Sequence, residues 1–156
     1  MARYFNASLK NLQARLRKFK SILSEELEKT ILENEEVIIQ MITEQQLYEQ
    51  GIEGRGIEIA SYRPYAWSTI KRKHKKGQPV DRVTLRDTGK FYKSLHVEFD
   101  PTGGFYIVST DYKAKYLLKR YGTTIFRLTD SNLKILLDDY IRPSLLVKLK
   151  ESLQHD

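Results

Sequence analysis

Apolar residues recur every three or four positions from Ser8 to about Gln46, which is the spacing of one face of an α-helix. The apolar stripe consists of Leu9, Leu12, Leu16, Phe19, Leu23, Leu27, Ile31, Ile38 and Ile42. Ser8 suits the N-cap of this helix, and Gly51 stands where a helix commonly ends. Residues 1–46 therefore predict one long amphipathic helix, or two in succession, that bends or packs on another subunit.

Residues 47–88 lack this periodicity. Glycine and proline interrupt a polar, basic stretch at Gly51, Gly54, Gly56, Pro64, Gly77 and Pro79. Such punctuation predicts a long loop or extended arm, and loops of this length tend to be functional. Tyr48, Tyr62, Tyr65 and Trp67 are large anchors, so we expect the arm to dock, either on another molecule or on the chain's own core.

A β-hairpin is predicted after the arm. Asp87 or Thr88 suits the cap of a short helix that precedes it. Apolar and polar residues alternate over residues 95–99, residues 100–104 supply turn chemistry, and residues 105–110 are aromatic and β-branched. These features are typical of two antiparallel strands joined by a tight turn.

Three further elements follow the hairpin. A short helix ends at Gly122, a third short strand covers residues 123–127, and a last helix begins at Thr129 or Asp130. Pro143 is expected to kink or split that last helix, because proline removes a backbone donor.

The order of these elements predicts a single α+β domain over residues 1–156, with helices packed on one face of a small antiparallel sheet. Residues 1–46 form its helical N-terminal segment, residues 47–88 the extended arm, and residues 89–156 an α+β core with the C-terminal helix. A chain of 156 residues has the usual size of one domain.

Composition narrows the classes of function. The chain has no cysteine, which excludes disulfides, thiolate catalysis and zinc sites with cysteine ligands. No segment approaches the roughly 20 apolar residues of a membrane span, so we expect no membrane partner and a location in the cytoplasm. The net charge of +7 favours an anionic partner, either nucleic acid or an acidic protein surface.

Charge is distributed in blocks along the chain. Residues 1–20 carry six lysines and arginines with no acid, whereas residues 25–49 carry eight glutamates and one lysine. A second basic block covers residues 71–76, in a stretch without helical periodicity. This alternation suits head-to-tail contact between copies, in which the second basic block meets Glu25–Glu36 of a neighbour, or else the blocks are solvated faces.

Residues that carry catalysis or bind metals are scarce. The histidines, His74, His96 and His155, do not have metal-ligand spacing. Glu98 and Asp100 would suit a metal-dependent nuclease, but Glu98 falls on the polar side of the predicted strand, where a solvated carboxylate is expected. The glycines match no phosphate-binding loop. We therefore expect no enzymatic activity, no cofactor and no metal.

The second basic block suits sequence-independent contact with nucleic acid. Its cations are Lys71, Arg72, Lys73, Lys75 and Lys76. Each can neutralise a phosphate, and such contacts make the affinity fall steeply with salt. Tyr62, Tyr65 and Trp67 lie close by in sequence and offer rings for stacking on exposed bases.

Two stretches resemble the virion-morphogenesis and tail-completion proteins of tailed bacteriophages. The first has a glycine-bearing turn, an aromatic, a threonine and a lysine, then a leucine, a Thr-Gly pair and a serine. These residues are Gly51, Tyr62, Trp67, Thr69, Lys71, Leu85, Thr88, Gly89 and Ser94. The second, Tyr116–Phe126, contains Arg120-Tyr121-Gly122 and resembles the family's aromatic and Tyr-Gly segment before a final helix.

The resemblance implies an α+β structural subunit without an active site, which assembles with copies of itself into a ring around the channel through which DNA leaves the head. Its other partners would be neck, portal-side or tail proteins, with non-specific contact to DNA in the channel. Its location would be the head–tail junction of the virion, after assembly in the host cytoplasm. The adaptor, stopper, tail-completion and terminator positions are all open. The alternative is a sequence-independent nucleic-acid-binding protein.

Within this interpretation, the candidates for the arm and the ring interface are Tyr62, Trp67, Arg86, Thr88, Gly89 and Phe91. We expect Thr88 and Gly89 to fix the turn into the short helix, with Gly89 adopting a backbone angle that other residues resist. The five cations of residues 71–76 are the candidates for contact with DNA in the channel or with an acidic partner.

Overall fold

The computed structural model describes the backbone of residues 2–154 and the side chains of residues 13–154. The fold is α+β, and its strands are β1 (Leu95–Phe99) and β2 (Phe105–Ser109). The α-helices are α1 (Ala2–Glu33), α2 (Glu35–Gln40), α3 (Ile59–Tyr62), α4 (Trp67–Lys75), α5 (Lys90–Lys93), α6 (Ala114–Tyr121), α7 (Asp130–Ile135) and α8 (Arg142–Gln154). The π-helical segments are η1 (Met41–Gln50) and η3 (Leu136–Ile141), and η2 (Thr123–Phe126) is a 3-10 helix.

The chain divides into two compact units. Residues 34–136 form the central unit, which contains the hairpin and most of the short helices. The residues before Asn34 and after Leu136 form the second unit, which we call the helical pair because it consists mainly of α1 and α8. Among the described residues, no helix combines the length and the apolar character that crossing a membrane requires.

The N-terminal segment forms successive helices, as predicted. Asn34 separates α1 from α2, and η1 continues from α2 to Gly51. Gly51 has a φ of 68°, a left-handed conformation that glycine adopts without steric cost, so the predicted helix end is confirmed. The prediction for Ser8 was wrong, because α1 already begins at Ala2. The side chains of Leu9 and Leu12 lie outside the described residues.

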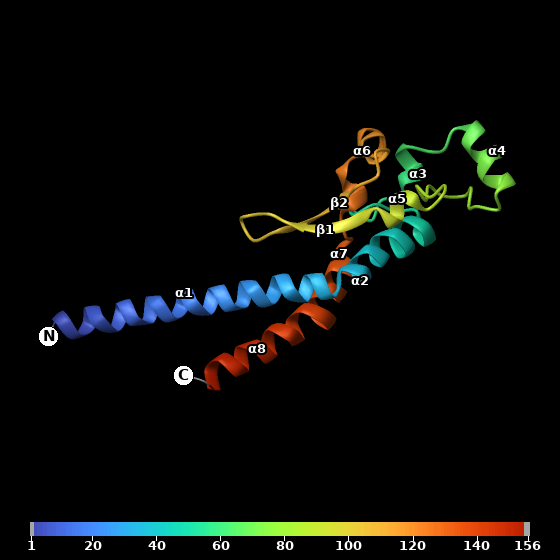
Figure 1. Cartoon of the computed structure of the whole chain (residues 1–156). Helices are drawn as coiled ribbons and strands as arrows, with labels where there is room; N and C mark the ends of the chain where they lie inside the picture. Colours follow the sequence, from blue (N-terminus) through green and yellow to red (C-terminus); the bar gives the residue numbers. More distant parts are fainter. Residues whose placement is uncertain (1, 155–156) are drawn as a thin grey trace. The chain divides into compact units, whose positions relative to one another are not determined.

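In the helical pair, α1 and α8 lie side by side and run antiparallel (Figure 1). Ser144 Oγ donates a hydrogen bond to Glu26 Oε1 over 2.9 Å, and Thr30 Oγ1 contacts Ser144 Oγ at the same distance. Pro143 lies next to the start of α8, directly after the π-helical turn of η3. The predicted disturbance at Pro143 is thus a change of helical hydrogen bonding, which suits a residue without a backbone donor.

The predicted hairpin is confirmed. Leu95 pairs with Ser109 and Phe99 with Phe105 in an antiparallel register. The Asp100 carboxylate accepts hydrogen bonds from the backbone N–H of Thr102 and of Gly104, at 2.6 and 3.4 Å, and so holds the turn. Its role is therefore structural rather than catalytic.

The core of the central unit is mainly apolar and includes a polar cluster around Gln46. Its fully buried apolar side chains include Ile38, Ile42, Leu47, Ile59, Ile125 and Leu136. The Gln46 amide donates to Arg127 O and accepts from Thr129 N–H and from the Asn132 amide, at 2.9 to 3.0 Å. Thr129 Oγ1 accepts from Asn132 N–H and caps α7, as predicted. Gln46 thereby joins η1 to the start of α7.

Residues 47–88, for which the sequence indicated a long loop or extended arm, are partly helical. They contain α3 and α4, and Ile59, Val83 and Thr84 are buried within the central unit. The aromatic anchors explain this difference, because Tyr65 docks on the chain itself: its Oη accepts from Thr84 N–H over 2.9 Å. Of the two alternatives for these rings, Tyr65 follows the internal one.

The prediction of a third strand was also wrong, since residues 123–126 form η2. The carbonyl of Thr124 accepts from Arg127 N–H over 3.1 Å, which closes a local turn, and from Gly54 N–H over 2.9 Å. Ile125 is fully buried beneath this turn. Of the β-branched residues that favoured a strand, Ile125 therefore serves core packing in a helical turn.

Candidate functional site

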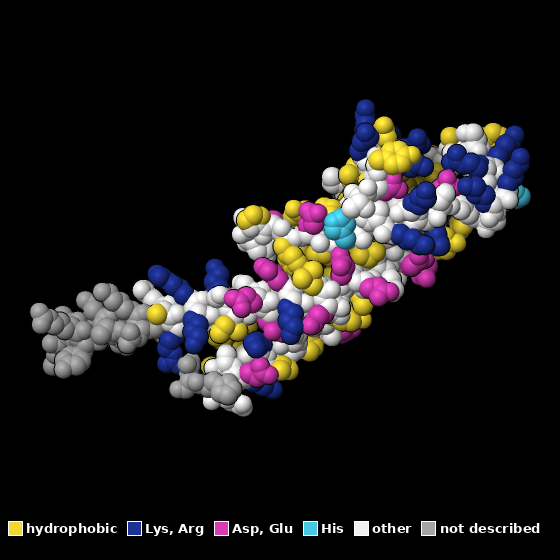
Figure 2. Space-filling model, in the orientation of Figure 1, with side chains coloured by type: hydrophobic (Ala, Val, Ile, Leu, Met, Phe, Trp, Pro, Cys, Tyr) yellow, Lys and Arg dark blue, Asp and Glu magenta, His cyan; other side chains and the backbone are white. Residues whose placement is uncertain are grey.

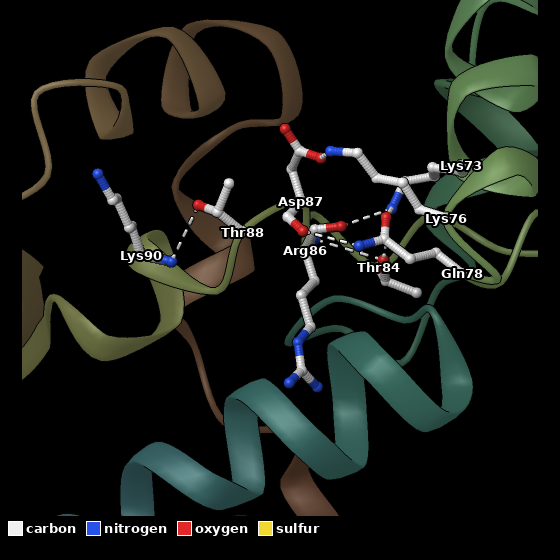
Figure 3. A network of polar contacts seen from close by, with 8 residues as sticks. All are labelled: Lys73, Lys76, Gln78, Thr84, Arg86, Asp87, Thr88 and Lys90. Atoms are coloured by element: carbon white, nitrogen blue, oxygen red, sulfur yellow. Dashed lines mark hydrogen bonds and ion pairs between the residues drawn. The ribbon is translucent and has the colours of Figure 1, made fainter.

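The lysine at the centre of the second basic block points into the protein. Lys73 is only 4% exposed, and its Nζ donates to Arg86 O, Gln78 Oε1 and Thr84 Oγ1, at 2.5, 3.2 and 3.3 Å (Figure 3). A lysine amine has three donors, and all three are used here. Lys73 therefore cannot contact DNA or an acidic partner as predicted. It ties α4 to residues 78–86.

Two tyrosines hold the same loop from other sides. Tyr65 Oη accepts from the N–H of Thr84 and of Leu85, and Tyr92 Oη donates to Thr84 O. Burial raises the pKa of Tyr92 far above its usual value, which keeps this donor protonated. Leu85 has a φ of 55°, a conformation that costs roughly 1–2 kcal/mol for a residue with a Cβ atom. The hydrogen bonds to Thr84 and Leu85 stabilise this strained turn.

Arg86 also has its partners inside the central unit. Its guanidinium carbon lies 4.8 Å from the Tyr48 ring centroid and 5.8 Å from that of Tyr92. Arg86 Nη1 is 3.6 Å from Glu44 Oε2, and in Figure 3 the side chain extends towards η1, away from Lys73. Arg86, predicted to act at an interface, thus joins its loop to η1.

The Thr-Gly pair forms the turn into α5. Gly89 has a φ of 82°, the left-handed conformation predicted for it, and occupies the N-cap position. Thr88 Oγ1 accepts from Lys90 N–H over 3.4 Å, whereas Asp87 does not cap the helix. The Asp87 carboxylate instead accepts a hydrogen bond from Lys76 Nζ, which lowers the pKa of that carboxyl. Lys76 is thereby partly neutralised.

The remaining interface candidates differ in exposure. Phe91 is 7% exposed and stacks on Phe126, with 5.9 Å between ring centroids, so it belongs to the core. Tyr62 is half-buried and donates from Oη to Tyr121 O over 3.5 Å. Burial is the main cause that raises the pKa of Tyr62. Trp67 is 69% exposed and is the aromatic candidate that remains available to a partner.

Trp67 begins the helix that carries the exposed cations. Lys71, Arg72 and Lys75 are exposed, and Lys71 Nζ lies 5.5 Å from the Trp67 ring centroid. Figure 2 shows Lys and Arg side chains gathered over α4. The sequence lacked helical periodicity here because a lysine, rather than an apolar residue, occupies the buried position of α4. The helix was therefore missed, but the exposed cations it carries were found.

The short helix predicted to end at Gly122 is α6 (Ala114–Tyr121), and its cations had not been recognised as candidates. On α6 and just before it, exposed lysines, arginine and tyrosines alternate: Tyr112, Lys113, Lys115, Tyr116, Lys119 and Arg120. The segment 112–129 contains no acidic residue, which was the available signal. The resemblance to the Tyr-Gly segment of phage proteins bears on the fold of this segment and not on its charge.

The two edges of the hairpin differ. On β1, Val97 N–H donates to Glu35 Oε1 over 2.6 Å, and α2 packs against the strand. Along β2 runs a groove of about 670 Å³, lined by all five residues of the strand and by apolar side chains that include Leu118, Phe126 and Leu133. Within the described residues, no segment pairs with this second edge.

Few described side chains are arranged for catalysis or metal binding. No cluster of three or more acidic or histidine side chains among residues 13–154 is placed to hold a metal ion. His96 Nε2 lies 3.2 Å from Glu98 Oε1, an exposed pair on the hairpin, and His74 is exposed on α4. The prediction for His155 lies outside the described residues. Glu53 is fully buried with Arg55 Nε 2.9 Å from its Oε1.

Comparisons with protein-family models, with curated proteins and with solved structures give no match to this chain.

Proposed function

We propose that this protein is a structural subunit of the head–tail connector, or neck, of a tailed bacteriophage. In this role it is not an enzyme: it assembles with copies of itself into a ring around the DNA channel and contacts neighbouring neck, portal-side or tail proteins. The resemblance over Leu85–Ser94 and Tyr116–Phe126 supports the proposal. These two stretches pack together through the stacked rings of Phe91 and Phe126.

The unpaired edge of β2 is the observation that supports assembly into a ring. Asp100 N–H bonds to Gly104 O and Thr110 N–H to Ser94 O, at 2.9 and 3.1 Å. Given the register, the N–H and C=O groups of alternate residues on β2 point towards β1, and those of Phe105, Ile107 and Ser109 point away from it. An unpaired edge of this kind is a template for a strand from another chain.

A second copy of the chain is the proposed occupant of this edge. An extended segment of the neighbour would pair with β2 and place alternate side chains in the apolar groove beside it. The edge is used once per subunit and the segment that fills it lies elsewhere, so the contact is heterologous. Repeated heterologous contacts form a ring when the rotation closes.

Disruption of the gene in its phage or prophage tests the proposal. Negative-stain electron microscopy should show filled heads and separate, unjoined tails. Tails of abnormal length would indicate the terminator position. Intact infectious virions would contradict the structural role.

The edge contact is tested by complementing that disruption with two variants. Ser109→Pro removes an outward backbone donor but leaves the β1–β2 pairing, because the Ser109 N–H points away from β1. Ser109→Ala is the matched control, since it loses the same hydroxyl and keeps the donor. We expect the alanine variant to restore virions and the proline variant to fail. Equal rescue by both would exclude the β2 edge as the ring contact.

The second candidate function is sequence-independent binding of nucleic acid without a place in the virion. The exposed Lys71, Arg72 and Lys75 of α4 favour it, and Lys71 lies beside the exposed ring of Trp67. It predicts salt-dependent binding of short duplexes together with normal virions after disruption of the gene.

A further inference from the structure

The cations of α6 have no acidic partner among the described residues. Lys113, Lys115, Lys119 and Arg120 are exposed, and no ion pair joins any of them to a described carboxylate. Lys71, Arg72 and Lys75 of α4 also form no ion pair with a described carboxylate. Asp87 pairs with Lys76, and its pKa is lowered mainly by Lys76 and to a smaller extent by Arg72. Uncompensated charge of one sign attracts polyanions over a distance of several ångströms.

Exposed rings accompany these cations in a repeated arrangement. Tyr112 is 73% exposed and Tyr116 is 60% exposed. Lys113 Nζ lies 5.7 Å from the ring centroid of Tyr112, and Lys115 Nζ lies 5.0 Å from that of Tyr116. On α4, Lys71 Nζ lies 5.5 Å from the ring centroid of Trp67 in the same way. Each pair offers a positive charge beside a flat apolar face. A nucleotide presents the complementary groups, a phosphate and a base.

Direct contacts join α6 to the segment that leads into α4. Arg63 Nε donates to Arg120 O, and Arg120 Nη2 donates to Pro64 O, both over 3.4 Å. Tyr62 Oη reaches Tyr121 O over 3.5 Å. Trp67 begins α4 three residues after Pro64, so residues 64–66 link the C-terminal end of α6 to the start of α4. In Figure 2, Lys and Arg side chains occur over both helices.

The internal anchors of α4 decide which of its cations face outward. Lys73 points inward to Arg86 O and Thr84 Oγ1, so its neighbours Arg72 and Lys75 are directed to solvent. The bridging residues Arg63 and Arg120 are themselves exposed and add charge where the two helices meet. Residues 59–80 and 112–129 contain no Asp or Glu. The charged side chains of these two segments are therefore all cations, and Asp87 offsets part of their charge where it pairs with Lys76 at the end of α4.

We propose that α4 and α6 together form one nucleic-acid-binding surface that follows the sugar-phosphate backbone and stacks bases or sugars on Trp67, Tyr112 and Tyr116. This inference rests on the proposed function in one respect: DNA in the channel would be the ligand. An acidic protein is the less suitable partner, because carboxylates would use the cations but not the three exposed rings. Binding is independent of sequence, since no element presents side chains suited to reading base edges.

Fluorescence anisotropy with the purified full-length chain tests the surface. The probes are a labelled single strand and a labelled duplex of about 20 nucleotides, titrated between about 50 and 300 mM salt. The α6 variant is Lys113→Glu, Lys115→Glu and Lys119→Glu combined, and the α4 variant is Lys71→Glu, Arg72→Glu and Lys75→Glu combined. The control makes the same change of charge in the helical pair, at the exposed Lys18, Lys20 and Lys150.

The α4 and α6 variants should each bind at least about tenfold more weakly than the control variant at about 100 mM salt. Each should also lower the slope of log affinity against log salt by roughly 2 to 3, as expected for three lost phosphate contacts. An α6 variant that binds like the control would overturn the composite surface. Circular dichroism spectra that match the wild type show that the variants are folded.

Two further measurements separate nucleic acid from an acidic protein. Tyr112→Ala combined with Tyr116→Ala keeps the charge and should weaken binding of the single strand by at least about thirtyfold, because stacking contributes roughly 1–3 kcal/mol per base. Poly-glutamate should compete poorly with DNA at equal charge. Unchanged binding by the tyrosine variant, or equal competition by poly-glutamate, would overturn the assignment to nucleic acid.

Failure of this inference can be told apart from failure of the proposed function. Binding is measured on the purified chain, whereas the connector role is judged from particles in the microscope. If the α6 variant loses DNA binding but virions are normal after gene disruption, the binding surface is supported and the connector role is contradicted. If the α6 variant binds DNA normally but heads and tails are unjoined after gene disruption, the connector role is supported and the binding surface is contradicted.

Discussion

The helical pair and the central unit bury their apolar residues to very different degrees. In the central unit, Leu47 and several isoleucines are completely buried. In the helical pair, no residue of α8 is buried, and Leu16 and Val147 are both 58% exposed. Two helices in contact along one face cover too little apolar surface to offset the entropy of ordering them. The central unit thus has a closed apolar core, whereas in the helical pair apolar side chains of both helices remain open to solvent.

A pair of matched leucine truncations tests this difference and should have the largest effect. Leu47→Ala leaves a cavity in a closed core and should lower the free energy of unfolding by about 3 kcal/mol or more. Leu145→Ala, at a half-buried position of α8, should cost about 1 kcal/mol because solvent already reaches it. Urea unfolding followed by circular dichroism measures both. Equal losses would show that the helical pair is as closed as the central unit.

The buried lysine offers a second test, with an intermediate effect. Lys73→Met keeps the length of the side chain and removes three donors, which leaves Arg86 O, Thr84 Oγ1 and Gln78 Oε1 without them. We expect the free energy of unfolding to fall by about 2–3 kcal/mol. Arg72→Met on the exposed side of the same helix should stay within about 0.5 kcal/mol of the wild type. A Lys73→Met protein of wild-type stability would mean that the cost of burying the amine cancels its hydrogen bonds.

The smallest expected effect concerns the ion pair at the surface of the central unit. The Lys76 amine lowers the pKa of Asp87, so this pair stabilises the fold above the ordinary pKa of the carboxyl and the gain is lost as pH falls through the folded value. Because both side chains are partly exposed, solvent limits the gain to less than about 1 kcal/mol.

Asp87→Asn should therefore have a lower free energy of unfolding than the wild type at neutral pH, and the two values should converge in acid. Unfolding by urea at a series of pH values measures this difference. A difference that stays constant into acid would show that the hydrogen bond to Lys76, rather than the charge, is what matters.

Local sequence signals predicted the elements whose causes are themselves local. Gly51 ends a helix and Gly89 forms a turn because both adopt positive φ angles, and Thr129 caps α7 with its own hydroxyl. The hairpin followed from alternation on either side of a Gly-rich turn. These features depend on residues within a few positions of one another, so they could be read from the chain.

Long-range contacts explain the elements that sequence reasoning missed. The helix α4 has no apolar stripe because its inward position is Lys73, whose acceptors lie up to 13 residues away. Residues 123–127 looked like a strand because of their β-branched residues, but Thr124 O is used by Gly54 and by a local turn. Phe91 looked like an interface residue until Phe126 was placed against it.

The α+β class, the succession of N-terminal helices, the hairpin, the positive-φ glycines and the exposed cations of α4 followed from the chain alone. The internal place of Lys73, the contact of Arg86 with η1 and the contacts between α6 and residues 62–64 became visible only in the folded protein. Periodicity records which residues share a face of one element. Which faces meet depends on hydrogen bonds and packing between residues that are far apart in the chain.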